Sequence, residues 1–216
     1  MSRPLNAAIF DFGGVLTTSP MAGIHVYEDR LGIEHGALLR VVTGDSSDGN
    51  DPWHRLERGE LDAREFWFDV KRRSAEDLGI EISLSDLTAS FAEGFKTRDG
   101  LISLIGELRE TDLPMAILTN NVKEFGSVWK SMIPVDELFD TVVDSSDVGM
   151  RKPDPRIYEV TLERLGAEAE ITVFVDDTRE NVTAAEELGM TGIHFAPEVA
   201  EEDVVSEIRK LFAHRF

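Results

Sequence analysis

The chain has 216 residues, of which 42% are hydrophobic, and its formal net charge at pH 7 is −20. So large an excess of acidic groups argues against nucleic acid or an anionic membrane surface as a partner, because phosphate groups select basic faces. The lack of cysteine excludes disulfides, thiol catalysis and cysteine-based zinc sites, while the lack of a signal-type segment and of an apolar run long enough to cross a bilayer predicts a cytoplasmic protein.

The first predicted element is a short strand over residues 7–10, whose uninterrupted apolar run is typical of a strand buried on both faces. Asp11 stands at its carboxyl end, and Gly13 and Gly14 follow at once. Two glycines allow a sharp turn and the close approach of a ligand to the main chain. Because a carboxylate is costly to bury, Asp11 is expected to face a crevice and meet a cation, although this stretch alone fits an ordinary turn aspartate equally well.

Residues 21–95 have apolar side chains at helical spacing and lack a convincing buried strand. The positions expected to point inward are Leu56, Phe66, Trp67, Val70 and Leu78. Residues 45–52, DSSDGNDP, have the composition of a loop, and Gly59 marks a joint between two helices. This part of the chain is therefore predicted to be a helical insertion that covers a site on a sheet.

From residue 99 onward, strands alternate with helices. Short apolar runs predict strands at residues 115–118, 141–143, 172–175 and 192–195. Amphipathic spacing predicts helices at residues 99–110, 125–129, 155–165, 180–188 and 199–212, and the stretch SSDVGMRKPDP is expected to be a loop. Such alternation indicates parallel strands joined by right-handed crossovers, and hence an α/β fold.

Four polar clusters fall at the carboxyl ends of these strands or just beyond them. They are Asp11, the pair Thr119 and Asn120, Lys152, and the pair Asp176 and Asp177. Each has an ordinary explanation when taken alone, such as a helix N-cap for Thr119 or a solvated loop position for Lys152. Ligands of parallel sheets gather at the edge where the strands end, so the common position of the clusters favours one shared site.

These residue types suit phosphoryl transfer to or from a small phosphorylated metabolite. Magnesium prefers oxygen ligands and is commonly held by one or two carboxylates, which Asp11 and Asp177 supply. A carboxylate beside the metal can also act as a nucleophile. The hydroxyl of Thr119 and the N–H groups of Asn120 suit phosphate oxygens, and Lys152 adds a point charge. Positioning and charge neutralisation are most of what phosphoryl transfer asks of a protein.

The segments DFGGVLTTS, LTNN, RKPDPRIY and FVDDTRENV resemble, in this order, the four motifs of the haloacid dehalogenase-like hydrolase superfamily. The residues of these motifs are most similar to those of the branch that contains the amino-terminal phosphatase domain of soluble epoxide hydrolase and the hydrolase-like domain of some acyl-CoA dehydrogenases. The resemblance implies a Rossmann-like α/β core of residues 1–18 and 96–216, with a parallel sheet in the order 5-4-1-2-3 flanked by helices. It also implies that residues 19–95 form a helical cap domain.

The same resemblance implies a role for each candidate residue. Asp11 would be the nucleophile and a ligand of Mg²⁺. The main-chain carbonyl of Gly13 and the carboxylate of Asp177 would complete the protein ligands, with Asp176 as an indirect partner of the metal. Thr119, Asn120 and Lys152 would hold the phosphate, and Lys152 counts as catalytic for that reason. The implied reaction is hydrolysis of a small phosphate monoester through an aspartyl-phosphate on Asp11.

Gly13 departs from the superfamily pattern, because phosphatases of this kind usually carry a second aspartate two residues after the nucleophile as general acid and base. A positioned acid is typically worth about a hundred- to ten-thousand-fold in rate. His25, His54 and Asp45 are alternative proton donors, although a surface role is commoner for such residues. The departure also supports a second hypothesis, a phosphate-binding or regulatory homologue with little turnover.

Two other classes of protein fit the sequence less well. Dehalogenases of the same superfamily are metal-independent, whereas this chain keeps the paired acids of the metal-dependent members. Receiver domains of two-component signalling also place acids, a threonine and a lysine on an α/β sheet. Their acid pair comes first in the chain, whereas Asp176 and Asp177 come last here.

Overall fold

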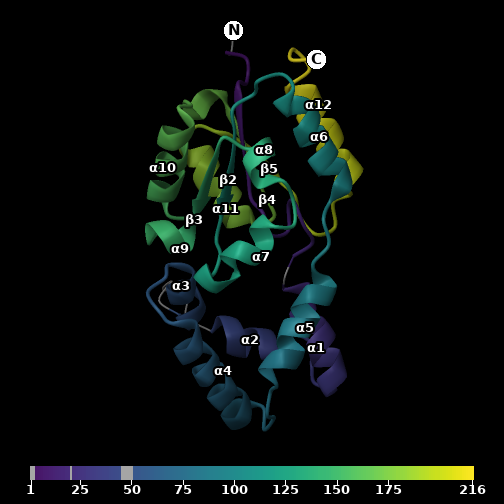
Figure 1. Ribbon diagram of the computed structural model, residues 1–216, viewed down its shortest axis with the longest axis vertical. Coiled ribbons are helices and arrows are strands. Elements are labelled where there is room, and N and C mark those ends of the chain that lie inside the picture. The colour runs from purple at the N-terminus through teal and green to yellow at the C-terminus, as the bar shows by residue number, and fades with distance from the viewer. Residues whose placement is uncertain (1–2, 20, 45–50) are drawn as a thin grey trace.

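The structure is a computed structural model that describes residues 3–19, 21–44 and 51–216. Within these ranges the chain forms a five-stranded parallel sheet in the order β3-β2-β1-β4-β5 (Figure 1). The strands are β1 (Ala7–Phe10), β2 (Met115–Thr119), β3 (Thr141–Asp144), β4 (Thr172–Asp176) and β5 (Thr191–His194). Counted from the other edge, this is the predicted order 5-4-1-2-3, so the predicted α/β fold is confirmed.

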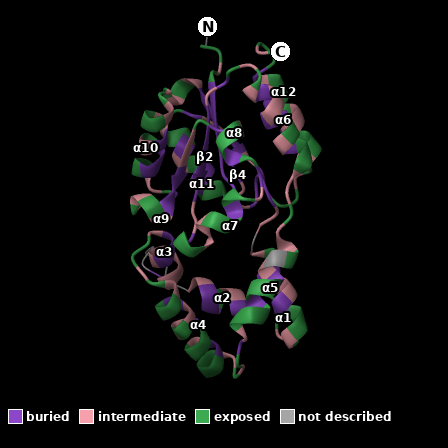
Figure 2. Cartoon of the chain, in the orientation of Figure 1, coloured by how far each residue is buried: buried purple, intermediate pink, exposed green. Residues whose placement is uncertain are grey.

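The central strand β1 is buried because helices cover both faces of the sheet (Figure 2). Ala8 and Phe10 belong to a hydrophobic cluster on one face, and Ile9 belongs to a separate cluster on the other. This alternation explains why the strand reads as an unbroken apolar run. The long helices beside the sheet are α6 (Asp99–Arg109), α10 (Pro155–Leu165), α11 (Arg179–Glu187) and α12 (Glu201–Leu211). Among the described helices, none is both long and apolar enough to cross a membrane.

Several short elements were not predicted. The stretch SSDVGMRKPDP, expected to be a loop, begins with α9 (Ser145–Val148). The side chain of Asp144 caps this helix by accepting a hydrogen bond of 3.0 Å from the N–H of Ser146. The other short elements are η1 (Lys123–Phe125), α7 (Gly126–Lys130), α8 (Val135–Leu138) and η2 (Ala169–Ile171), of which η1 and α7 divide the helix expected at residues 125–129. Elements of three to five residues are too short to show a helical period.

Five helices between β1 and α6 form what we call the helical unit, which lies beyond one end of the sheet in Figure 1. They are α1 (Ala22–Leu31), α2 (Ala37–Thr43), α3 (Pro52–Glu57), α4 (Ala63–Asp77) and α5 (Leu84–Gly94). The unit has a hydrophobic cluster, which Val122 and Phe125 of the segment after β2 also join. In this cluster Leu56, Phe66 and Val70 are buried, as predicted, and Trp67 and Leu78 are partly buried. Of the predicted loop at residues 45–52, residues 45–50 lie outside the described part of the chain, and Pro52 begins α3.

The chain enters and leaves the helical unit through two linkers that run side by side. The N–H of Thr18 donates to the carbonyl of Lys96 at 2.8 Å, and the N–H of Arg98 donates to the carbonyl of Leu16 at 2.9 Å. The segment before α1 is therefore paired with the segment after α5. The two covalent connections between the helical unit and the sheet therefore lie at one place.

Glu28 organises the helical unit from within. Its carboxylate is buried and accepts hydrogen bonds of 2.8, 2.7 and 3.1 Å from the N–H groups of Gly36, Leu38 and Leu39, at the start of α2. His25 Nδ1 lies 2.8 Å from the same carboxylate. Burial favours the neutral acid, but these hydrogen bonds outweigh it and hold the pKa of Glu28 below its ordinary value. The ionised side chain thus caps a helix that lacks a cap of its own.

We expect Glu28→Gln to destabilise the protein by roughly 1–3 kcal/mol at neutral pH, because an amide cannot accept all of these hydrogen bonds. A carboxyl whose pKa is lowered by folding stabilises the protein above its unfolded-state pKa, and this contribution is lost as the pH falls through the folded-state value. Urea unfolding between pH 7 and pH 3 should therefore show wild type and variant converging at the acid end. Glu34→Gln, at an exposed position, is the control. A gap that stayed constant across this range would contradict the assignment.

Candidate functional site

The four predicted clusters meet at the edge of the sheet that faces the helical unit. Asp11 follows β1, Thr119 ends β2 with Asn120 next, and Asp176 ends β4 with Asp177 next. Each polar residue therefore takes its position from the end of a buried strand. Lys152 joins them from the segment between α9 and α10.

Lys152 is the centre of the site. Its side chain is 1% exposed, and its Nζ donates to Asp176 Oδ2 at 2.6 Å and to the carbonyl of Leu118 at 2.9 Å. Asp11 Oδ1 lies 2.8 Å from the same nitrogen. Burial disfavours the charge on Lys152, but the carboxylates of Asp11 and Asp176 outweigh it and raise the pKa of the ammonium. The explanation of Lys152 as a solvated loop residue is therefore wrong.

Asp176 is held entirely by the protein. It is fully buried, and in addition to Lys152 it accepts hydrogen bonds from the N–H of Thr178 at 2.8 Å and from Asn181 Nδ2 at 3.0 Å. Both of its oxygens are thus occupied, one by the ammonium and the other by the first turn of α11. This arrangement fixes Asp176 in place. Its carboxylate is buried, whereas Asp177 is partly exposed.

Asp177 reaches the same space from beside the glycine turn. A Cβ built on Gly14 would lie 2.0 Å from Asp177 Oδ2, and Gly14 has a φ of +89°. Only glycine satisfies both conditions, because L side chains rarely adopt that conformation and any side chain would collide with the carboxylate. Glycine at position 14 of the predicted turn therefore allows the carboxylate of Asp177 to lie against the main chain.

The site has the composition of a magnesium centre. One oxygen each of Asp11, Asp176 and Asp177 lies within 4.8 Å of the others. Three carboxylates face the single ammonium of Lys152, which leaves a surplus of two negative charges. Burial, more than the neighbouring acids, raises the pKa of Asp11 to about 7, and burial also raises the pKa of Asp177. A divalent cation with a preference for oxygen ligands would remove this surplus, so these residues fit Mg²⁺.

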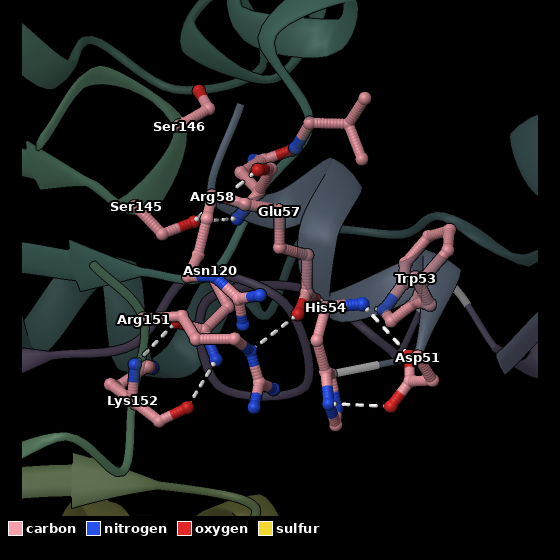
Figure 3. A network of polar contacts seen from close by, with 12 residues as sticks. Asp51, Trp53, His54, Glu57, Arg58, Asn120, Ser145, Ser146, Arg151 and Lys152 are labelled. Carbon is pink, nitrogen blue, oxygen red and sulfur yellow. Dashed lines mark hydrogen bonds and ion pairs between the residues drawn. The ribbon is translucent and has the colours of Figure 1, made fainter. Parts of the chain in front are cut away.

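Asn120 acts on Lys152 rather than presenting its amide to the open site. Its Oδ1 accepts a hydrogen bond of 2.8 Å from the N–H of Lys152, and its Nδ2 donates one of 3.0 Å to the carbonyl of Lys152 (Figure 3). The side chain thus holds the main chain of Lys152 on both sides. The amide of Asn120 is thus engaged within the protein, next to the buried Thr119, and the contact of Asn120 with phosphate stays a prediction.

Three residues of this region were not singled out from the sequence. Glu57 in α3 accepts a hydrogen bond of 2.7 Å from Arg151 Nε, and Ser145 Oγ donates one of 2.6 Å to the carbonyl of Glu57 (Figure 3). The only signal in the sequence was the place of Arg151 directly before Lys152. Glu57 and Arg151 are 94 positions apart, so local patterns do not reveal their contact.

Two of the candidate proton donors, His25 and His54, lie on the helical unit. His25 pairs with Glu28 in α1, and His54 Nδ1 lies 2.6 Å from Asp51 at the start of α3. Asp45 lies outside the described residues. Gly13, where the superfamily pattern places an acid, forms an isolated bridge with Thr17 within the turn.

The sequence matches the family model of haloacid dehalogenase-like hydrolases over residues 5–189. It is 31% identical over 224 residues to the sesquiterpene phosphatase astK of Aspergillus oryzae, covering 98% of each chain. It is 30% identical over 212 residues to mouse acyl-CoA dehydrogenase family member 10, covering 97% of this chain and 19% of that protein. It is also 29% identical over 201 residues to pig bifunctional epoxide hydrolase 2, covering 88% of this chain and 36% of that protein. The chain thus spans a minor part of two of these relatives.

Solved structures share the fold. The structure of a HAD family enzyme from Bacteroides thetaiotaomicron, in complex with magnesium and inorganic phosphate, matches with a TM-score of 0.66. The sequences are 19% identical, and the match covers 93% of this chain and 98% of that one. The arrangement of sheet and helical unit described above is thus found in a protein that binds both magnesium and phosphate.

Proposed function

We propose that this chain, which belongs to the haloacid dehalogenase-like hydrolase family, is a magnesium-dependent phosphatase that hydrolyses a small phosphate monoester. The observation that carries the proposal is the convergence of Asp11, Lys152, Asp176 and Asp177 at the end of the sheet. The full-length match to a relative named as a phosphatase supports the choice of reaction. We also propose a role in this reaction for each of these residues of the chain.

In this proposal Asp11, the carbonyl of Gly13 and Asp177 hold Mg²⁺. Asp176 supports the metal indirectly, because its oxygens already bind Lys152, Thr178 and Asn181. The ion would neutralise charge on the phosphoryl oxygens and allow two anions, carboxylate and phosphate, to approach each other.

The side chains carry out the transfer in two steps. In the first, a carboxylate oxygen of Asp11 attacks phosphorus and the bond to the leaving oxygen breaks, giving an aspartyl-phosphate and an alcohol. In the second, water attacks the phosphorus, and inorganic phosphate leaves with Asp11 regenerated. The hydroxyl of Thr119 and the main-chain N–H of Asn120 hold the phosphoryl oxygens throughout, and Lys152 supplies positive charge beside them.

We further propose that the helical unit is a cap domain of residues 19–95 on a core of residues 1–18 and 96–216. It lies beyond the edge that carries the site, and its α3 contacts the segment next to Lys152 (Figures 1 and 3). In that position it excludes water and contacts the part of the substrate that leaves. The proton needed by the leaving oxygen comes from the substrate, from water or from this unit, where His54 is the candidate beside the network of Figure 3.

The test compares an aryl phosphate with an alkyl phosphate, each with magnesium and with chelator. A phenolate leaves without much help from an acid, whereas an alkoxide does not. Because Gly13 replaces the usual acid, we expect magnesium-dependent turnover of the aryl ester to exceed that of the alkyl ester by roughly a hundred-fold or more. Equal rates would mean that another group supplies the proton. Binding of magnesium and phosphate without turnover of either ester would instead support the binding-protein function that Gly13 also suggests.

We expect Gly14→Ala to weaken magnesium binding and lower turnover by about a hundred-fold, the usual cost of misplacing a group by an ångström. The new Cβ would lie 2.0 Å from Asp177 Oδ2 and force this carboxylate away. Calorimetric titration with Mg²⁺ measures the first effect and initial rates measure the second. Gly106→Ala is the control, since a Cβ there meets open space. Unchanged magnesium affinity in Gly14→Ala would exclude Asp177 as a ligand.

A further inference from the structure

The end of α3 is joined to the core by two polar contacts that leave from one residue. Glu57 Oε2 accepts a hydrogen bond of 2.7 Å from Arg151 Nε, and the carbonyl of Glu57 accepts one of 2.6 Å from Ser145 Oγ (Figure 3). The other oxygen of the Glu57 carboxylate accepts a hydrogen bond of 2.9 Å from Trp53 Nε1. Glu57 is therefore held at its side chain and its main chain.

Burial separates this contact from the ordinary ion pairs of the surface. The side chains of Glu57 and Arg151 are 7% and 20% exposed, whereas those of Glu107 and Arg209, also 2.7 Å apart, are 43% and 45% exposed. The turn after α3 also packs closely against the core, because a Cβ at Gly59 would lie 2.9 Å from the carbonyl oxygen of Ser146. A buried charged pair is sensitive to the loss of either partner, while an exposed pair contributes little.

Both core partners of Glu57 adjoin residues proposed to bind phosphate. Arg151 directly precedes Lys152. Ser145 Oγ accepts a hydrogen bond of 3.0 Å from the N–H of Asn121, which directly follows Asn120. Asn120 in turn holds the main chain of Lys152 on both sides. Glu57 of the helical unit is thus connected to both segments that form the phosphate site. It reaches Lys152 through Arg151, and it reaches Asn120 through Ser145 and Asn121.

We propose that Glu57 is a positioning residue that, through Arg151 and Ser145, fixes the Lys152 and Asn120 segments when the helical unit is docked on the core. The phosphate site is then complete only in the docked arrangement. The proposal rests on the proposed function, because it concerns affinity for the phosphoryl group at that site. Small displacements matter there, since Nζ of Lys152 contacts three groups at 2.6–2.9 Å.

The experiment measures the Kd of inorganic phosphate by calorimetry in the presence of Mg²⁺. We expect Glu57→Ala and Arg151→Ala each to raise this Kd at least tenfold. The double variant should be no worse than the weaker-binding single variant, because the two residues act as one unit. Glu57→Gln keeps an acceptor for Arg151 and should stay within threefold of wild type. Glu107→Ala, from the exposed pair of equal length, should match wild type.

A pair with only a structural role would lower the unfolding temperature and leave the Kd of phosphate unchanged. A Kd within threefold of wild type in both alanine variants, or losses that add in the double variant, would overturn the proposal. If Glu57→Ala does not fold, Arg151→Ala removes the same contact from the core side and should by itself raise the Kd at least tenfold, with Glu57→Gln as its control. Wild type that binds no phosphate would overturn the proposed function as well, whereas wild type that binds phosphate beside unaffected variants would overturn the positioning role alone.

Discussion

Asp11→Asn should abolish turnover and leave the fold intact. The amide has the shape of the carboxylate but is not a nucleophile, so the aspartyl-phosphate cannot form and the rate should fall by roughly 10⁴-fold or more. Lys152 keeps Asp176 and the carbonyl of Leu118 as partners. Because the change also removes one of three crowded carboxylates, we expect the unfolding temperature to stay equal or to rise.

Initial rates on an aryl phosphate and a thermal melt test both parts of this prediction. Asp136→Asn, at an exposed position of α8, is the matched control and should behave as wild type. Turnover by Asp11→Asn at the wild-type rate would contradict the assignment of Asp11 as the nucleophile. A variant that is stable, inactive and still able to bind phosphate would support it most directly.

Lys152→Met should damage both stability and turnover. The buried carboxylates of Asp11 and Asp176 would face each other without the ammonium between them, and loss of one member of a buried ion pair typically costs about 3–5 kcal/mol. Arginine should not restore the site, because its planar fork cannot donate in the three directions that Nζ uses. Added Mg²⁺ should reduce the loss of stability by supplying part of the missing positive charge.

Urea unfolding with chelator and with magnesium measures the loss in Lys152→Met. Lys71→Met is the control, because Lys71 is exposed on α4 and such changes usually stay within about 0.5 kcal/mol. A stability equal to wild type would mean that the site does not depend on the ammonium. The binding of phosphate, measured in the same samples, should be lost in Lys152→Met whether or not magnesium restores the fold.

The strand ends could be predicted because burial leaves a simple pattern in the sequence. Residues 7–10 are apolar without interruption since β1 is covered on both faces, and the first polar residue after the run, Asp11, marks the edge. The same reasoning placed Thr119 and Asp176, although it ended both strands one residue early. In each strand the final residue is polar but buried, and so hydrophobicity alone stopped short of it.

The contacts between distant segments could not be predicted, because they depend on how the folded pieces meet. Asn120 could be assigned to phosphate from its chemistry, but its amide instead holds the main chain of Lys152, 32 positions away. The pairing of Glu57 with Arg151 depends on where α3 comes to rest, and nothing local at either residue specifies that. A glutamate in an amphipathic helix reads as a solvated residue until its neighbours are known.

The paired linkers have a consequence for how such proteins vary. Because Thr18 and Lys96 are hydrogen-bonded neighbours, the chain leaves the sheet and returns to it at almost the same point. The closure entropy of an insertion depends only weakly on its length when its two ends lie together. Helices can therefore be gained, lost or exchanged between Leu16 and Arg98 without moving a strand. The strand ends that carry Asp11, Thr119 and Asp176 can therefore stay in place while the helical unit diverges, provided that contacts such as that of Glu57 with Arg151 are kept.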